Sequence, residues 1–313
     1  MICSFTKSEK RETKKMVDYR TIIRLLAIGC VIAALVGMLL LSGTKQEWRV
    51  TDEGLLEYPP CTPDYQLTPL ETGDNYTLYE VKFTSRDTQI AGLLRMPRTQ
   101  QGNGIPGVVL LPGATVTKEG EQGLAKYLCD LGYASIALDQ RNVGVIDINA
   151  DLQLYLNGKE PTEHKMVHDA LAAAEVLRNQ PEIDPERIVF TGESNGARFA
   201  IIACALDPEA REVIAISTCG YGIDAAIASG QLNDPDMIRF YRSIDPETYL
   251  NKIPPRKFVM IHSVNDTIIP YENAEQTYAK AFEPKELHNV ECATHGYCSE
   301  MAETLKTELE GMV

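Results

Sequence analysis

The sequence predicts an α/β domain built on a doubly wound, mainly parallel β-sheet, preceded by one N-terminal transmembrane helix. Three observations lead to this prediction. The chain has 313 residues, 44% of them apolar, which is enough for one large core. Short β-branched runs alternate with segments of helical spacing through most of the chain. Residues 25–41 form an apolar run without any charge.

The apolar run near the N-terminus reads LLAIGCVIAALVGMLLL, and Ile22 and Ile23 extend it toward the roughly 20 residues that span a bilayer. Seven Lys or Arg precede it, but only two follow it as far as Glu57. This charge bias predicts a basic cytoplasmic segment (1–24), a signal anchor (25–43) and a body outside the cell membrane. A cleaved signal peptide is the alternative, although SGTKQ is a poor cleavage site. A lipoprotein anchored at Cys30 is disfavoured because most of the apolar run follows that cysteine.

The next segment, residues 44–75, is rich in Pro, Asp, Glu and Thr and shows no sustained period, so we expect a stalk or loosely packed lead-in. Its last residue, Asn75, begins Asn75-Tyr76-Thr77, a glycosylation sequon that fits an exported body. We expect the folded domain to span residues 76–313.

The first two strands of this domain are predicted from TLYEVKFTS and TQIAGLLRM, which alternate apolar and polar residues around a turn at Arg86-Asp87. Five later runs are apolar throughout, as in strands buried on both faces: IPGVVLLPG, YASIALDQR, RIVFTGES, REVIAISTCG and RKFVMIHS. Helical spacing predicts helices at 119–131, 164–179, 195–206, 272–282 and 297–309. In such sheets ligands bind at the carboxyl ends of the strands.

The charge of the chain limits its partners. Residues 1–50 carry nine basic and four acidic side chains, so residues 51–313 carry 21 basic and 40 acidic ones, within a total of −14. Such an acidic body repels phosphate backbones, which argues against a nucleic-acid partner. With five histidines in no zinc-like cluster and no glycine-rich phosphate loop, the sequence predicts no metal and no cofactor. The oligomeric state stays open.

The run RIVFTGESNGARFAIIACAL places Gly192-Glu193-Ser194-Asn195-Gly196 between a buried strand and an apolar helix. In this context G-x-S-x-G predicts a sharp turn that exposes the serine oxygen above the sheet. Glycines are expected two positions before and two positions after Ser194, because a Cβ at either position would clash where the strand and the helix meet. The alternative is an ordinary strand-to-helix turn.

From about Tyr76 onward the chain resembles an α/β-hydrolase, similar to the dienelactone-hydrolase-like and acyl-peptidase-like esterases. The resemblance implies a triad in the order Ser, acid, His. Asp266 occupies the acid position in Val264-Asn265-Asp266-Thr267-Ile268-Ile269-Pro270, and an N-cap role is its alternative. His295, in Cys292-Ala293-Thr294-His295-Gly296-Tyr297, matches the family's H-G-[FY] corner. His288 and His262 lie in strands and are expected to be structural, while His164 and His168 are expected on a polar helix face.

The resemblance also implies an oxyanion hole, formed by the backbone N–H of Asn195 and by the loop Pro112-Gly113-Ala114-Thr115. In that loop Ala114 is the first choice of donor and Thr115 the second. The segment 139–144 resembles a supporting D-x-R-G-x-G stretch in which Asn142 replaces a glycine.

A short helical cap is expected at about residues 220–254. Its aromatic and Met side chains either line a substrate pocket or form the cap's own core: Tyr221, Met237, Phe240, Tyr241 and Tyr249.

We therefore expect a serine hydrolase that cleaves carboxylic esters of small substrates through an acyl-enzyme, with Ser194, His295 and Asp266 as its triad. The alternatives are an amidase or peptidase using the same triad and a non-catalytic surface binding protein. An outward-facing body also favours a disulfide between Cys292 and Cys298, which straddle His295. The competing interpretation places Cys298 in the core of the last helix as a small apolar residue.

Overall fold

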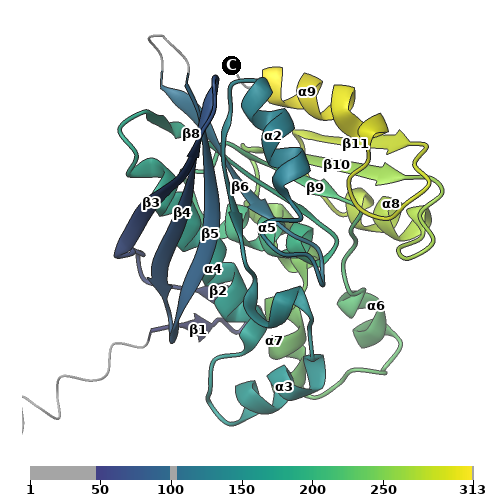
Figure 1. Ribbon diagram of the computed structural model, residues 1–313. Coiled ribbons are helices and arrows are strands. Elements are labelled where there is room, and N and C mark those ends of the chain that lie inside the picture. The colour runs from purple at the N-terminus through teal and green to yellow at the C-terminus, as the bar shows by residue number, and fades with distance from the viewer. Residues whose placement is uncertain (1–46, 99–103, 312–313) are drawn as a thin grey trace, which may run out of the picture. The chain divides into compact units, whose positions relative to one another are not determined.

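A nine-stranded sheet organises the part of the chain that the computed structural model describes, residues 47–98 and 104–311 (Figure 1). The strands lie in the order β11-β10-β9-β8-β6-β7-β5-β4-β3. Their bounds are β3 Tyr65–Thr72, β4 Tyr76–Ser85, β5 Thr88–Pro97, β6 Ile105–Leu111, β7 Ala134–Leu138, β8 Ile183–Glu193, β9 Glu212–Ile216, β10 Lys257–Ser263 and β11 Lys285–Val290.

The six strands from β11 to β7 are parallel, whereas β5, β4 and β3 join antiparallel at one side. Strands β6, β7 and β9 are buried along their whole length, as expected of strands covered on both faces. Because β8, β9 and β10 are adjacent and parallel, the loops after Glu193, Ile216 and Ser263 meet at one edge of the sheet.

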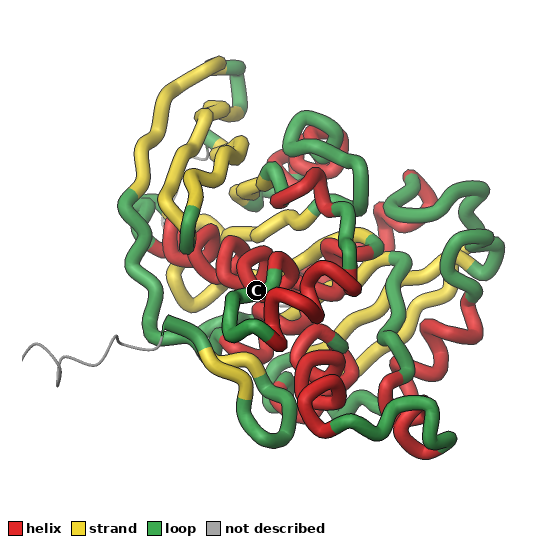
Figure 2. The backbone as a smooth tube through the Cα atoms, turned by 90° about the horizontal axis from the view of Figure 1, so that it is seen from below, coloured by secondary structure: helices red, strands yellow, loops and turns green. Residues whose placement is uncertain are grey.

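The helices are α2 Gln122–Asp130, α3 Ile148–Leu156, α4 Thr162–Arg178, α5 Asn195–Leu206, α6 Ile223–Ala228, α7 Pro235–Ile244, α8 Tyr271–Ala279 and α9 Ala302–Glu310, with 3₁₀ turns η1 Arg141–Gly144, η2 Pro246–Lys252 and η3 Ser299–Met301. Helices α2 and α9 pack on one face of the sheet, and α4 and α5 pack on the other (Figures 1 and 2). This confirms the predicted α/β architecture with helices on both faces. Helix α3 was not among the predicted helices; only Asp151 and Leu152 are buried within it, so its sequence shows little periodicity.

The prediction of a stalk at 44–75 is wrong for the described residues 47–75. A small antiparallel pair, β1 Arg49–Val50 and β2 Leu56–Glu57, precedes β3, and β3 pairs with β4. Leu56 is fully buried, and its N–H donates to the Tyr249 hydroxyl at 2.8 Å. The folded unit therefore starts at Trp48 rather than at residue 76. The sequence pattern did not predict strand β3, because β3 is an edge strand with most of its side chains exposed and so lacks an alternation of apolar and polar residues.

The predicted helical cap at 220–254 is present as α6, α7 and η2. Phe240 is fully buried in a cluster with Leu152 of α3 and Ile244, and Tyr221, Met237 and Tyr241 pack against this cluster. The aromatic side chains of the cap thus form a core of their own together with α3. Tyr249 instead belongs to the main core, where its hydroxyl also donates to the Ser243 carbonyl.

The predicted signal anchor at 25–43 and the basic segment at 1–24 lie outside the described residues. Among the helices that the structure does describe, none has the length and apolar character needed to cross a membrane. The anchor and its orientation stay predictions.

Candidate active site

Ser194 lies at the turn between β8 and α5, with φ 54° and ψ −117°. This conformation is unfavourable for a residue with a Cβ, and such strain concentrates at functional sites. The flanking glycines are required by space. A Cβ on Gly192 would lie 2.6 Å from the Gly196 carbonyl carbon, and one on Gly196 would overlap the Leu111 carbonyl. The predicted strand-turn-helix geometry is therefore present.

Asp266 and His295 meet through a hydrogen bond of 2.7 Å between Oδ2 and the imidazole Nδ1. The other carboxylate oxygen, Oδ1, accepts the N–H groups of Ile268 and Ile269, each at 2.9 Å. Burial acts to raise the pKa of Asp266, but the hydrogen bonds from Ile269, His295 and Ile268 outweigh it and hold this pKa below its ordinary value. Asp266 therefore stays ionised and keeps a hydrogen on Nδ1, which leaves Nε2 with its lone pair.

The imidazole Nε2 of His295 is buried, and no described residue provides it with a hydrogen-bond partner. Ser194 and His295 are thus brought to the same edge of the sheet without a hydrogen bond between them in this conformation. Contacts of this kind often tighten only when substrate binds. What holds the two loops together is Glu193, whose Oε2 accepts the Tyr297 N–H at 2.8 Å.

The loop after β6 lies directly beside Ser194, since a Cβ on Gly113 would be 3.6 Å from the Ser194 Cβ. In this loop the Thr115 N–H already donates to the Val143 carbonyl at 2.8 Å. The Ala114 N–H makes no such bond to any residue that the structure describes. Of the two predicted oxyanion donors in the loop, Ala114 is therefore the one that stays available.

The segment 139–144 supports that loop, as the sequence predicts. Asp139 accepts the Lys118 N–H at 3.1 Å, and Gln140 donates to the Pro112 carbonyl. Arg141 forms a two-point ion pair with the buried Asp169, at 2.7 and 3.1 Å. Asn142, which replaces a glycine, has φ 50° and tolerates this because asparagine is among the residues that enter the left-handed region.

Two of the remaining histidines lie elsewhere than predicted. His164 and His168, expected on a polar helix face, are buried and bond to Ser243 Oγ at 2.7 Å and Ser85 Oγ at 2.8 Å. The helix turns them inward because α4 packs between the sheet and α7. His262 is fully buried beside the acid loop, with Nε2 2.9 Å from the Ile269 carbonyl.

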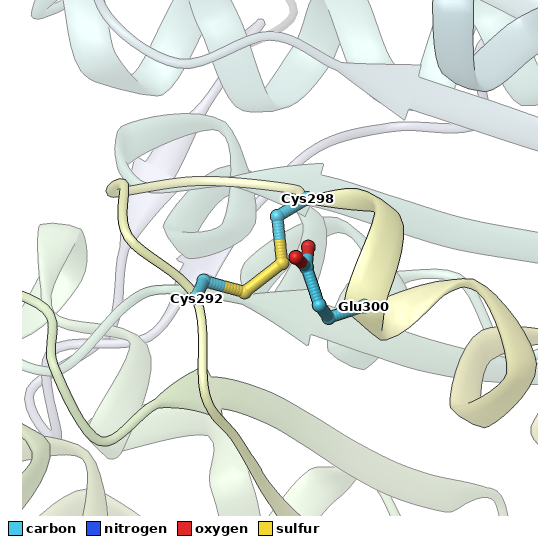
Figure 3. A group of neighbouring side chains, drawn as sticks. All are labelled: Cys292, Cys298 and Glu300. Atoms are coloured by element: carbon cyan, nitrogen blue, oxygen red, sulfur yellow. A yellow bond between two sulfur atoms is a disulfide. The ribbon is translucent and has the colours of Figure 1, made fainter.

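Cys292 and Cys298 form a disulfide across the loop that carries His295, with Cα atoms 6.3 Å apart (Figure 3). Glu300 lies beside this bridge, but both sulfur atoms are already bonded to each other. A second cluster with metal-like spacing, Glu286, His288 and Glu308, already holds the Lys257 ammonium between its two carboxylates, at 2.8 and 2.6 Å. We assign a metal to neither cluster.

Glu193 is a residue of this site whose role the sequence did not reveal. The only signal was a charged side chain at the end of a strand whose five preceding residues, 188–192, are all buried.

Comparison with known proteins places this geometry in context. The family model described as acetyl xylan esterase (AXE1) matches residues 48–253. The Escherichia coli (strain K12) protein YfhR, described as uncharacterized, is 25% identical over 218 residues, which cover 68% of this chain and 72% of YfhR.

Two solved structures share the fold. Acetyl xylan esterase 1 from Thermoanaerobacterium sp. JW/SL YS485 has a TM-score of 0.66 at 16% identity, covering 80% of this chain and 89% of that one. A glucuronoyl esterase from Solibacter usitatus has a TM-score of 0.60 at 13% identity, covering 85% and 89%.

Proposed function

The chain belongs to the acetyl xylan esterase family and is an ester-cleaving hydrolase of the α/β-hydrolase fold, and from this premise we propose that Ser194, His295 and Asp266 form its catalytic triad. The observation that carries the proposal is the Asp266–His295 hydrogen bond, which leaves Nε2 buried and without a partner among the described residues. The loop that carries His295 is bonded to Glu193, the residue before a serine held in a strained turn. A buried lone pair without a donor is what a general base for the Ser194 hydroxyl requires.

In the proposed reaction His295 Nε2 takes the Ser194 proton while Oγ attacks the acyl carbon. The N–H groups of Asn195 and Ala114 then hold the negative oxygen, helped by the N-terminus of α5. His295 returns the proton to the departing alcohol, which leaves an acyl-enzyme. Water attacks this ester in turn, and His295 takes a proton from the water. His295 then passes this proton to Ser194 Oγ as the acid departs, which regenerates the free serine and the neutral base.

We propose acetyl and other short acyl esters as the substrates, from the description of the matching family as acetyl xylan esterase. The test compares nitrophenyl acetate, longer nitrophenyl esters, an acetylated sugar and an aminoacyl anilide. The proposal expects the highest kcat/KM for the short esters. A preference for the anilide would favour amide cleavage by the same triad instead.

The roles of the residues are tested with Ser194→Ala and His295→Ala, which should lower kcat for nitrophenyl acetate by about 10⁴-fold or more. His288→Ala is the matched control, because His288 lies on β11 with Nε2 2.7 Å from Glu308. A serine-directed phosphonate should label the native chain but not Ser194→Ala. Unchanged turnover in Ser194→Ala, or labelling of that variant, would refute the assignment of the nucleophile.

We also propose that residues 25–43 anchor the enzyme in the cell membrane with its catalytic domain outside, from the charge bias around that run. Protease added to intact cells should then digest the catalytic domain. Protection of the domain would contradict the orientation, and its release in soluble form would contradict the anchor.

A further inference from the structure

Glu193 immediately precedes Ser194, and its carboxylate binds the turn after His295. Its Oε2 accepts the Tyr297 N–H at 2.8 Å, although the two residues are 104 positions apart. The same oxygen lies where Gly296 has no side chain: φ is +86° there, and a Cβ would be 2.5 Å from Oε2. The turn therefore lies against this carboxylate, and its positive φ favours glycine at position 296.

A second carboxyl group holds Glu193 from the other side. Glu121, at the start of α2, is only 3% exposed, and its carboxyl group lies within hydrogen-bonding reach of that of Glu193. Two neighbouring carboxylates inside a protein repel each other when both are ionised, which favours one shared proton. Burial and the neighbouring Glu193 raise the pKa of Glu121 to about 8. Burial also raises the pKa of Glu193, while the Tyr297 N–H, Glu121 and His295 act to lower it.

A histidine and two tyrosines also lie near this pair. His295 and Tyr297 face Glu193 from the catalytic loop, and Tyr127 of α2 faces Tyr297. Burial, Tyr127 and Glu193 raise the pKa of Tyr297 to about 12, so this phenol stays neutral. The Tyr127 hydroxyl donates to the Ala302 carbonyl at 2.8 Å.

We propose that Glu193, sharing one proton with Glu121, is a positioning residue that holds the turn after His295 and so keeps Nε2 in line with Ser194. This inference rests on the proposed roles of Ser194 and His295. When the shared proton is lost, two like charges are left in contact, and their repulsion separates the carboxyl groups and releases the Tyr297 N–H. Turnover then falls on the alkaline side near pH 8, without ionisation of the triad itself.

The experiment measures kcat and KM for nitrophenyl acetate from about pH 6 to pH 9.5. Glu193→Ala should lower kcat by about 10- to 100-fold and change KM by less than about threefold, because it misplaces the base and leaves the substrate contacts in place. Glu193→Gln should recover most of this loss, since its amide oxygen can accept the Tyr297 N–H and its NH₂ can donate to Glu121. This rescue separates positioning from simple loss of packing.

Glu121→Gln tests the shared proton. Its amide donates permanently to Glu193, so the alkaline limb of the kcat profile should move up by at least one pH unit. Glu212→Gln is the matched control, because Glu212 is also buried and has a pKa raised to about 8 by burial and by Glu308. It starts β9, away from the strand ends that carry Ser194, so this control should leave the profile unchanged.

Glu193→Ala with kcat within twofold of the native value, or an unmoved alkaline limb in Glu121→Gln, would overturn the inference. If Glu193→Ala does not fold, as judged by circular dichroism, the pH profile of Glu121→Gln decides alone. Activity in Ser194→Ala would instead remove the proposed function itself. An inactive Ser194→Ala beside an active Glu193→Ala leaves the proposed triad standing and refutes only the positioning role.

Discussion

Replacing Asp266 with asparagine changes one atom of the proposed triad, and the surrounding contacts dictate how the new amide must lie. Oδ1 accepts two backbone N–H groups, from Ile268 and Ile269. An amide turned the other way would point its NH₂ at both donors and leave them unpaired, at about 1–3 kcal/mol each. The amide oxygen of the variant therefore stays at the Oδ1 position, and its NH₂ faces His295.

This orientation reverses the tautomer of the imidazole. The amide NH₂ donates to Nδ1, so the ring hydrogen moves to Nε2, where it blocks acceptance of the Ser194 proton. The corresponding substitution in a serine protease lowers kcat by about 10⁴-fold. At about 1.4 kcal/mol for each factor of ten, this is roughly 5 kcal/mol of lost transition-state stabilisation.

The assay is turnover of nitrophenyl acetate at neutral pH, together with nitrogen NMR of the His295 ring. Asp234→Asn is the matched control: Oδ1 of Asp234 also accepts two backbone N–H groups, from Asp236 and Met237 at 3.0 Å each, but no described imidazole bonds to this carboxylate. Its turnover should stay within about threefold of the native value. More than a tenth of native activity in Asp266→Asn, or a ring hydrogen still on Nδ1, would refute the reasoning.

Two further predictions concern stability. Reducing the Cys292–Cys298 disulfide should lower the free energy of unfolding by about 2 kcal/mol in guanidinium titrations, because so short a loop constrains the unfolded chain only modestly. In the control variant Cys292→Ser/Cys298→Ser, reductant should not change this free energy. If reductant does not change it in the native protein either, the result argues against the bridge. Burial lowers the pKa of His164 to about 3, so the folded state resists a proton that the unfolded chain accepts below about pH 6.5. The stability due to this neutral ring is complete above pH 6.5 and is lost as the pH falls toward 3. The melting temperature of His164→Gln should therefore fall less steeply with decreasing pH than that of the native protein. An identical slope of melting temperature against pH would contradict this explanation.

Local patterns were enough to predict most of the fold. The β-branched runs from β6 to β10 and the periodic segments between them depend on neighbours within a few residues, and burial on both faces makes such strands recognisable. The predictions from sequence failed where a segment is only partly buried, or where its burial depends on elements far away in the chain. The edge strand β3 lacks an alternating pattern, and α4 turns His164 inward only because α7 packs against it.

The sequence by itself determined the α/β order of elements and the sharp turn at Ser194, and it predicted Asp266 and His295 as partners of this serine, because each lies in a short motif with a strand or helix beside it. Only the tertiary structure decided that residues 47–75 belong to the domain, that the Thr115 N–H is already used, and that Glu193 accepts the Tyr297 N–H in the loop that carries His295. These contacts join residues far apart in the chain. Whether such groups meet depends on how the sheet and its loops pack, and no local pattern of residues carries that information.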